Sequence, residues 1–157
     1  MERPLAGLRV VETTNNCGEL CGRLLSDLGA DVVLIEPPQG STLRQAAPFS
    51  PNNESLGFLW RNANKSGISL DTSTKEGYEE FTHLLSEADI WIESGENLYN
   101  SSIDSIAEMF PHLVITSITP FGSSGPYSGL IANDDVLEAI SGMMFKAGIA
   151  NKTPLLP

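Results

Sequence analysis

Short apolar runs alternate with helical patterns along most of the chain. The runs are rich in β-branched residues and predict five strands, at residues 8–12, 31–36, 67–70, 90–93 and 113–119. Apolar positions at helical spacing predict four helices, at about 20–28, 73–85, 102–109 and 134–145. Strands that alternate with helices predict an α/β fold with a doubly wound, mainly parallel sheet and helices on both faces.

Local signals predict where these helices begin and which faces they present. Four leucines fall on one face of the first helix: Leu20, Leu24, Leu25 and Leu28. Ser73 and Glu76 predict a capping box before the apolar stripe of the second helix. In the last helix, five residues are expected to face the core: Val136, Leu137, Ile140, Met143 and Met144.

Two stretches without a sustained period predict long connections, at residues 37–57 and 120–132. Long ordered connections often carry function. Residues 151–157 have no structural signal, and no linker divides the chain into two domains.

The chain is strongly acidic, with 20 acidic against 9 basic residues and a formal net charge of −11. This charge argues against nucleic acid or an anionic membrane as a partner. No apolar run is long enough to span a bilayer, and the start of the chain lacks a secretory signal pattern. We therefore expect a cytoplasmic protein.

Metal and nucleotide motifs are weak or missing in the sequence. Cys17 and Cys21 lie at helical spacing without a nearby histidine, which predicts reduced thiols and no metal site. Neither Gly-x-Gly-x-x-Gly nor a phosphate-binding Gly-x-x-x-x-Gly-Lys sequence occurs, so a dinucleotide or nucleotide triphosphate site is poorly supported.

Two general rules select candidate positions for chemistry. Parallel α/β sheets bind ligands at the carboxyl ends of their strands, which selects the loops after four residues: Glu12, Glu36, Glu93 and Thr119. Asn133 is a good N-cap, and it precedes Asp134 in the first turn of an apolar helix. The helix dipole keeps such a carboxylate ionised, so it serves either as ordinary capping chemistry or as a nucleophile.

Five motifs occur together along the chain: Pro-Leu-Ala-Gly-Leu-Arg-Val-Val at 4–11, Cys-Gly-Arg-Leu-Leu-Ser-Asp-Leu-Gly-Ala-Asp-Val-Val at 21–33 with its continuation to Pro38, Asn-Ala-Asn-Lys-Ser at 62–66, Pro-Phe-Gly-Ser-Ser-Gly-Pro-Tyr at 120–127 and Ser-Gly-Met-Met at 141–144. In this order and spacing they resemble the family III CoA-transferases, the group of formyl-CoA and crotonobetainyl-CoA transferases. Members of that family are much longer, so the chain is similar to the N-terminal portion of one.

The resemblance implies a Rossmann-like CoA-binding domain over residues 1–150, with residues 151–157 starting a linker to a missing second domain. It implies coenzyme A as a co-substrate without a metal, and an acyl-CoA and a small carboxylic acid as partners. In complete members of the family, two subunits interlock as a homodimer. The isolated 157-residue chain is therefore expected to be inactive.

The resemblance also implies site residues. The family's catalytic Asp precedes the Gly of the Ser-Gly pair by eight positions, which corresponds to Asp134 here. This carboxylate would attack an acyl-CoA thioester and form an anhydride, then an aspartyl-CoA thioester. Candidate CoA contacts are Thr14, Asn15, Asn16, Arg44, Arg61, Asn62, Asn64 and Lys65.

Departures from the family pattern keep alternatives open. The common Glu-Asn-Phe-x-Pro-Gly stretch is altered at Glu93–Leu98, which supports a non-catalytic CoA-docking or assembly module of a fused protein. An acyl-CoA racemase or isomerase of the same fold is another alternative. Such racemases carry a His directly before the Asp as one acid–base group. Here that position is Asn133, which cannot exchange a proton near neutral pH and so favours a transferase.

Overall fold

The computed structural model describes residues 3–14, 17–95, 98–146, 148 and 152 of the chain. These residues fall into two compact units, Met1–Ile118 and Thr119–Pro157. The first unit contains all the strands, and the second contains a long connection and one α-helix. The predicted domain over residues 1–150 stays a prediction, and the predicted linker at 151–157 lies outside the described residues except for Lys152.

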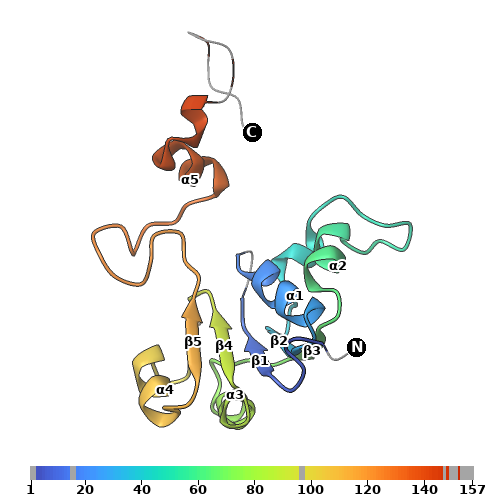
Figure 1. The fold of residues 1–157 in the computed structure, drawn as a ribbon, viewed down its shortest axis with the longest axis vertical. Coiled ribbons are helices and arrows are strands. Elements are labelled where there is room, and N and C mark those ends of the chain that lie inside the picture. The colour runs from blue at the N-terminus through green and yellow to red at the C-terminus, as the bar shows by residue number, and fades with distance from the viewer. Residues whose placement is uncertain (1–2, 15–16, 96–97, 147, 149–151, 153–157) are drawn as a thin grey trace. The chain divides into compact units, whose positions relative to one another are not determined.

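A five-stranded parallel sheet forms the centre of the first unit (Figure 1). Its strands are β1 (Arg9–Glu12), β2 (Asp31–Glu36), β3 (Ser66–Ser69), β4 (Ile90–Glu93) and β5 (Val114–Ser117). The spatial order is β3-β2-β1-β4-β5, so the direction of winding reverses between β1 and β4. Because all five strands are parallel, their carboxyl ends meet at one edge, where ligands bind in such folds.

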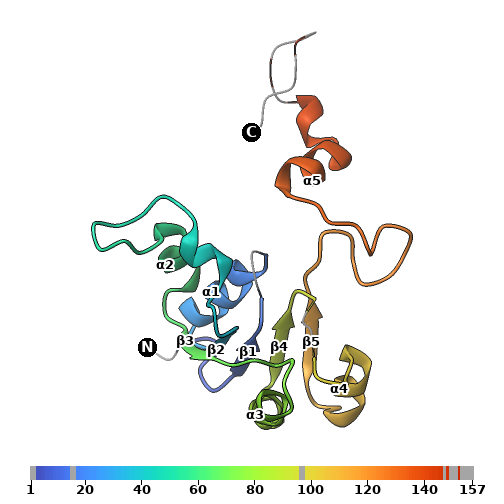
Figure 2. The same cartoon turned by 180° about the vertical axis from the view of Figure 1, so that it is seen from behind.

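Helices cover both faces of the sheet, as the sequence predicts. On one face, α1 (Glu19–Asp27) contributes Leu25 to a core cluster with residues of β1, β2 and β4. On the other face, α3 (Lys75–Ser86) and α4 (Ile103–Met109) bury Phe81 and Ile106 against Trp91. A further helix, α2 (Leu56–Asn62), lies side by side with α1 (Figures 1 and 2). The doubly wound α/β fold is therefore confirmed.

Of the four leucines predicted on one face of the first helix, Leu25 is half-buried and packs against the core, but the other three are exposed. Leu20, Leu24 and Leu28 are 44%, 56% and 46% exposed. The buried side of α1 is instead formed around Gly22 and Ser26, whose small side chains allow close approach to the sheet and to α2. The Ser26 hydroxyl donates to the carbonyl oxygen of Ala63 at 3.3 Å. Close packing at these small residues turns the three leucines outward.

Between β2 and α3, the structure corrects one local prediction and shortens another. The cap of α3 is Thr74 rather than Ser73, because the Thr74 hydroxyl accepts the backbone N–H of Gly77 at 3.1 Å. The stretch predicted as a connection contains a 3₁₀ turn at Thr42–Gln45 and leads into α2. The Ser55 hydroxyl caps α2, and burial of Phe58 stabilises this short helix.

The last predicted helix is shorter and more exposed than its pattern indicates. Helix α5 (Asp134–Ser141) ends at Gly142, whose left-handed φ of 79° stops the helix before a 3₁₀ turn at Met143–Lys146. Val136 and Ile140 are 42% and 68% exposed, so the predicted core face is wrong for these residues.

Substitution by alanine is expected to have opposite effects on stability at two helical glycines, Gly22 and Gly57. A Cβ at Gly22 would lie 1.7 Å from Glu12 Oε2, whereas a Cβ at Gly57 would meet only ordinary contacts at 3.7 Å. We expect Gly22→Ala to destabilise the protein by about 1–3 kcal/mol through overpacking. Gly57→Ala should be neutral or stabilise it by up to about 1 kcal/mol, since alanine favours the helix. Chemical denaturation of both variants checks this, and equal effects would contradict it.

Candidate functional site

Three neighbouring strands each end in a buried glutamate at the carboxyl edge of the sheet. Glu36, Glu12 and Glu93 are the last residues of β2, β1 and β4, and none of them is more than 7% exposed. Glu12 forms an ion pair with Lys65, and Glu36 forms one with Arg44. The Glu93 carboxylate accepts the backbone N–H of Gly95. Glu93 Oε1, however, is buried without a hydrogen-bond partner among the described residues. The edge selected by the parallel topology is therefore rich in buried carboxylates, two of which are paired with a cation.

A cavity of about 190 Å³ lies at this edge, beyond the ends of β1, β2 and β3. Its lining includes Thr13 and Thr14 after β1, Pro37 and Ser41 after β2, and a third segment, Leu70–Ser73, after β3. Two predicted loops therefore contribute to it, and the loop after β3 is an addition. Ligand pockets usually enclose about 300–1,000 Å³, so this cavity admits only part of a large ligand.

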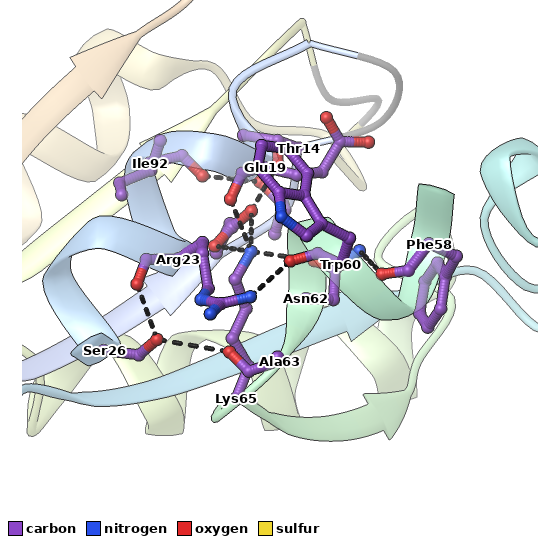
Figure 3. Close-up of polar contacts among 12 residues, drawn as sticks. Thr14, Glu19, Arg23, Ser26, Phe58, Trp60, Asn62, Ala63, Lys65 and Ile92 are labelled. Carbon is purple, nitrogen blue, oxygen red and sulfur yellow. Dashed lines mark hydrogen bonds and ion pairs between the residues drawn. The ribbon is translucent and has the colours of Figure 1, made fainter. Parts of the chain in front are cut away.

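A closed polar cluster lies beside the cavity, between β1, α1 and α2 (Figure 3). The Lys65 ammonium lies 2.9 Å from Glu12 Oε1 and 2.8 Å from Oε2. It also donates to Asn62 Oδ1 at 2.7 Å and to the carbonyl oxygen of Glu19 at 2.8 Å. The Thr14 hydroxyl donates to Glu12 Oε1 at 2.6 Å, which connects the ion pair to the cavity wall.

Burial dominates the electrostatics of this cluster. Desolvation raises the pKa of Glu12, although the Lys65 ammonium acts in the opposite direction. Burial likewise lowers the pKa of Lys65, against the attraction of Glu12. The pKa of the Cys21 thiol is also raised, first by burial and then by the Glu12 charge. Each of the two charges therefore depends on the other to stay ionised.

Arg44, a predicted CoA contact, forms a bidentate ion pair at the end of β2. Its Nε and Nη2 atoms donate to the two Glu36 oxygens at 2.6 Å each, and its guanidinium lies 3.8 Å from the centre of the Phe58 ring. The Arg44 side chain is nevertheless 50% exposed. Its charge is balanced by Glu36, and its role in ligand binding stays a prediction.

The Arg44–Glu36 pair predicts a pH-dependent contribution to stability. Hydrogen bonds from Arg44 hold the pKa of Glu36 below its ordinary value of 4.5. A carboxylate with a lowered pKa stabilises the folded state above its unfolded pKa, and that stability is lost as the pH falls through the folded value. We expect Arg44→Met to lower the melting temperature at pH 7 and to lose this effect progressively below about pH 4.5. Calorimetric scans across this range check the prediction, and a difference that stays constant to pH 3 would contradict it.

The other predicted contacts are dispersed around α1 and α2. Asn62 is the last residue of α2 and accepts from Lys65, whereas Asn64 donates to Asp27 Oδ1 at 2.7 Å. Arg61 lies half-buried in the last turn of α2. Thus Thr14 and Lys65 meet at Glu12, and Asn62 joins this cluster through Lys65. Arg44 and Asn64 do not belong to that cluster. Asn15 and Asn16 lie outside the described residues.

The predicted nucleophile begins a helix of the second unit. Asp134 is the first residue of α5 and is exposed, as is Asp135 beside it. The Asn133 side chain accepts the backbone N–H of Val136 at 3.2 Å, so it is the N-cap. A carboxylate in this first turn is favoured by the helix dipole. The predicted local geometry of the capped helix start is therefore present.

Sequence reasoning did not predict that two of the candidate CoA contacts, Lys65 and Arg44, form ion pairs with glutamates. These partners are Glu12 and Glu36. The available signal was their position, since each is the last residue of a buried strand. Asp71, Thr72 and Ser73 were also missed, although they directly follow the predicted third strand. That strand is short and weakly patterned, so its end is a weak signal in the sequence.

Within the described residues, no helix is long and apolar enough to cross a membrane. The same part of the chain contains no group of three or more His, Cys, Asp or Glu side chains that could hold a metal ion.

A doubly wound parallel sheet with its cavity at the carboxyl edge defines a Rossmann-like ligand-binding fold. The sequence profile described as CoA-transferase family III matches residues 5–157. The chain belongs to this family.

Named relatives agree with this assignment. The probable CoA-transferase Rv1866 of Mycobacterium tuberculosis is 39% identical over 143 residues, covering 88% of this chain and 18% of that protein. Succinyl-CoA:(R)-benzylsuccinate CoA-transferase subunit BbsE of Thauera aromatica is 34% identical over 163 residues, covering 99% of this chain and 40% of that protein. The formyl-CoA:oxalate CoA-transferase of Streptomyces avermitilis is also 34% identical, over 160 residues, covering 99% and 39%.

Solved structures share the fold. A CAIB/BAIF family protein from Brucella suis superposes with a TM-score of 0.92 at 32% identity, covering 100% of this chain and 44% of that one. The Mycobacterium tuberculosis protein Rv3272 gives a TM-score of 0.87 at 28% identity, covering 99% and 45%. The chain therefore spans less than half the length of these relatives and neighbours.

Proposed function

We propose that this chain is the N-terminal part of a CoA-transferase that moves CoA from an acyl-CoA to a carboxylic acid, with Asp134 as the nucleophile. The observation that carries the proposal is an exposed Asp134 in the first turn of α5, within a chain that matches the family along residues 5–157. The remaining length of the relatives supports a complete protein with further segments. We expect the isolated 157-residue chain to lack transfer activity.

In the proposed reaction, an oxygen of the Asp134 carboxylate attacks the thioester carbonyl carbon. The carbon–sulfur bond breaks, which leaves an aspartyl–acyl anhydride and the CoA thiolate. The thiolate then attacks the aspartyl carbon of the anhydride, which forms an aspartyl-CoA thioester and releases the first carboxylate. The acceptor carboxylate repeats these two steps in reverse order, which yields the new acyl-CoA and frees Asp134. Exclusion of water is required throughout, because hydrolysis would discard the activated intermediates.

The cavity at the carboxyl edge is proposed to receive an uncharged part of CoA. Its lining contains the carboxylates of Glu36 and Asp71 but no lysine or arginine. Hydroxyl groups and apolar atoms from Thr14 and Leu70 suit a nucleoside or a pantetheine arm better than a phosphate. Arg44, Arg61 and the loop after β1 remain the proposed neighbours of the phosphates.

Two other functions are tested by the same assay. The complete protein is incubated with a labelled acyl-CoA in deuterated water, with and without a panel of small carboxylic acids. Transfer of CoA to an acid supports the proposal. Exchange of the α-proton without transfer would indicate a racemase or isomerase, which Asn133 does not favour because its side chain caps α5. CoA binding without either reaction would indicate a docking module.

The acceptor acid, the interlocked homodimer and the cytoplasmic location stay predictions for the complete protein.

A further inference from the structure

The Lys65 side chain is buried in a cluster that the proposed reaction does not use. It is 1% exposed, and the Glu12 carboxylate is fully buried. An ammonium group has three N–H donors. Three groups surround this one within 3 Å, namely the Glu12 carboxylate, Asn62 Oδ1 and the carbonyl oxygen of Glu19. These contacts leave no donor of Lys65 for a ligand.

The same ammonium holds both ends of the loop between β1 and α1. Glu12 is the last residue of β1, and Glu19 is the first residue of α1. In the sequence, residues 13–18 lie between these two anchors. Lys65 belongs to a turn 53 residues away in sequence from Glu12, so the loop is closed by a contact from a separate part of the chain.

Glu12 connects the Lys65 ammonium to the wall of the cavity. Its Oε1 atom accepts both the Lys65 ammonium and the Thr14 hydroxyl, and Thr14 lines the cavity. The neighbouring Thr13 is held differently, because its hydroxyl accepts the indole N–H of Trp91 at 3.0 Å. The orientation of Thr14 therefore depends on Lys65 in a way that the orientation of Thr13 does not.

We propose that Lys65 is a positioning residue for CoA binding, which acts through Glu12 on Thr14 and through the carbonyl of Glu19 on the start of α1, without contacting CoA. This inference rests on the proposed function, since it assumes that the edge with Thr14 binds CoA. Lys65, which the resemblance implies as a direct CoA contact, would then act on CoA binding indirectly.

A double-mutant cycle in the complete protein tests the inference, with CoA and dephospho-CoA as probes in calorimetric titrations. We expect Lys65→Met and Thr14→Val each to weaken CoA binding about tenfold, as the loss of one well-placed hydrogen bond would. Combined, they should weaken binding no more than either alone, because both break the same connection. Affinities for CoA and dephospho-CoA, which lacks the 3′-phosphate, should fall by the same factor, since no contact with that phosphate is lost.

A second set of variants separates an effect on CoA binding from a loss of folding caused by an unpaired buried charge. Glu12→Gln with Lys65→Met removes both buried charges together, and Thr14→Val is repeated in that background. The expected result is again no additional loss from Thr14→Val. Lys75→Met is the matched control, because Lys75 forms an exposed ion pair with Glu79 at 3.7 Å, and it should bind CoA normally.

Each contrary outcome identifies what fails. Additive losses, unchanged binding by the Lys65 variants, or a larger loss for CoA than for dephospho-CoA would overturn the positioning role and leave the proposed function intact. Absence of CoA binding by the unsubstituted protein would overturn both.

Discussion

Replacing Asp134 with alanine is expected to abolish CoA transfer by the complete protein while leaving its fold intact. Removal of a nucleophile that forms a covalent intermediate typically lowers kcat by about four to six orders of magnitude. Asp134 is exposed and lies in the first turn of a helix, so its loss should cost only about 0.3–1 kcal/mol of stability through the helix dipole. Steady-state transfer rates and a melting curve for the same preparation measure both effects.

Asp135→Ala is the matched control for this experiment. Asp135 is exposed and occupies the same first turn of α5, so both variants lose one charge at the same helix end. We expect Asp135→Ala to melt like Asp134→Ala and to keep most of the transfer activity. Equal activities for the two variants would remove Asp134 from the proposed mechanism.

Replacing Lys65 with methionine is expected to lower the free energy of unfolding by about 3–5 kcal/mol, because it leaves the Glu12 carboxylate buried without a counterion. The loss should shrink as the pH falls. Burial raises the pKa of Glu12, so protonation at lower pH removes the unpaired charge. Urea denaturation of the variant between pH 5 and 8 would measure both the loss and its pH dependence.

The double variant Glu12→Gln with Lys65→Met separates the charge from the packing. It carries no uncompensated charge, so it should regain most of the stability lost by Lys65→Met alone. Lys75→Met removes an exposed lysine and should change stability by less than about 1 kcal/mol. A Lys65→Met protein as stable as the Lys75→Met protein would refute the view that the buried pair holds β1, α1 and α2 together.

The sequence predicts an element well where the residue pattern of the segment itself indicates that it is buried. The strand at Asp31–Glu36 matches β2 because a β-branched run ends abruptly at Pro37. Helix α2 was missed because seven residues are too few to show a helical period, and its stability depends on the Ser55 cap and the burial of Phe58. The face of α1 was wrong because Gly22 and Ser26, not the leucines, determine how closely it approaches the sheet.

The candidate site was predicted only in part, for a related reason. Loops after parallel strands and the Asn62–Ser66 motif are visible in the sequence, and the structure brings Thr14, Asn62 and Lys65 together. Glu12 joins Thr14 to Lys65, and it is far from Lys65 in sequence, so no local pattern indicates this pairing. Likewise, the charge of Arg44 is visible in the sequence, but its bidentate contact with Glu36 depends on the path of the connection between them.

The central claim is that Asp134 carries the transferred group, and trapping the covalent enzyme tests this most directly. The complete protein is mixed with acyl-CoA without an acceptor, quenched in acid, digested and analysed by mass spectrometry, with Asp134→Ala treated in parallel. The account predicts an acyl or CoA adduct on the peptide that contains Asp134, which disappears when an acceptor acid is added and is missing from the variant. Efficient transfer with no adduct on that peptide, or with an adduct on another residue, would contradict it.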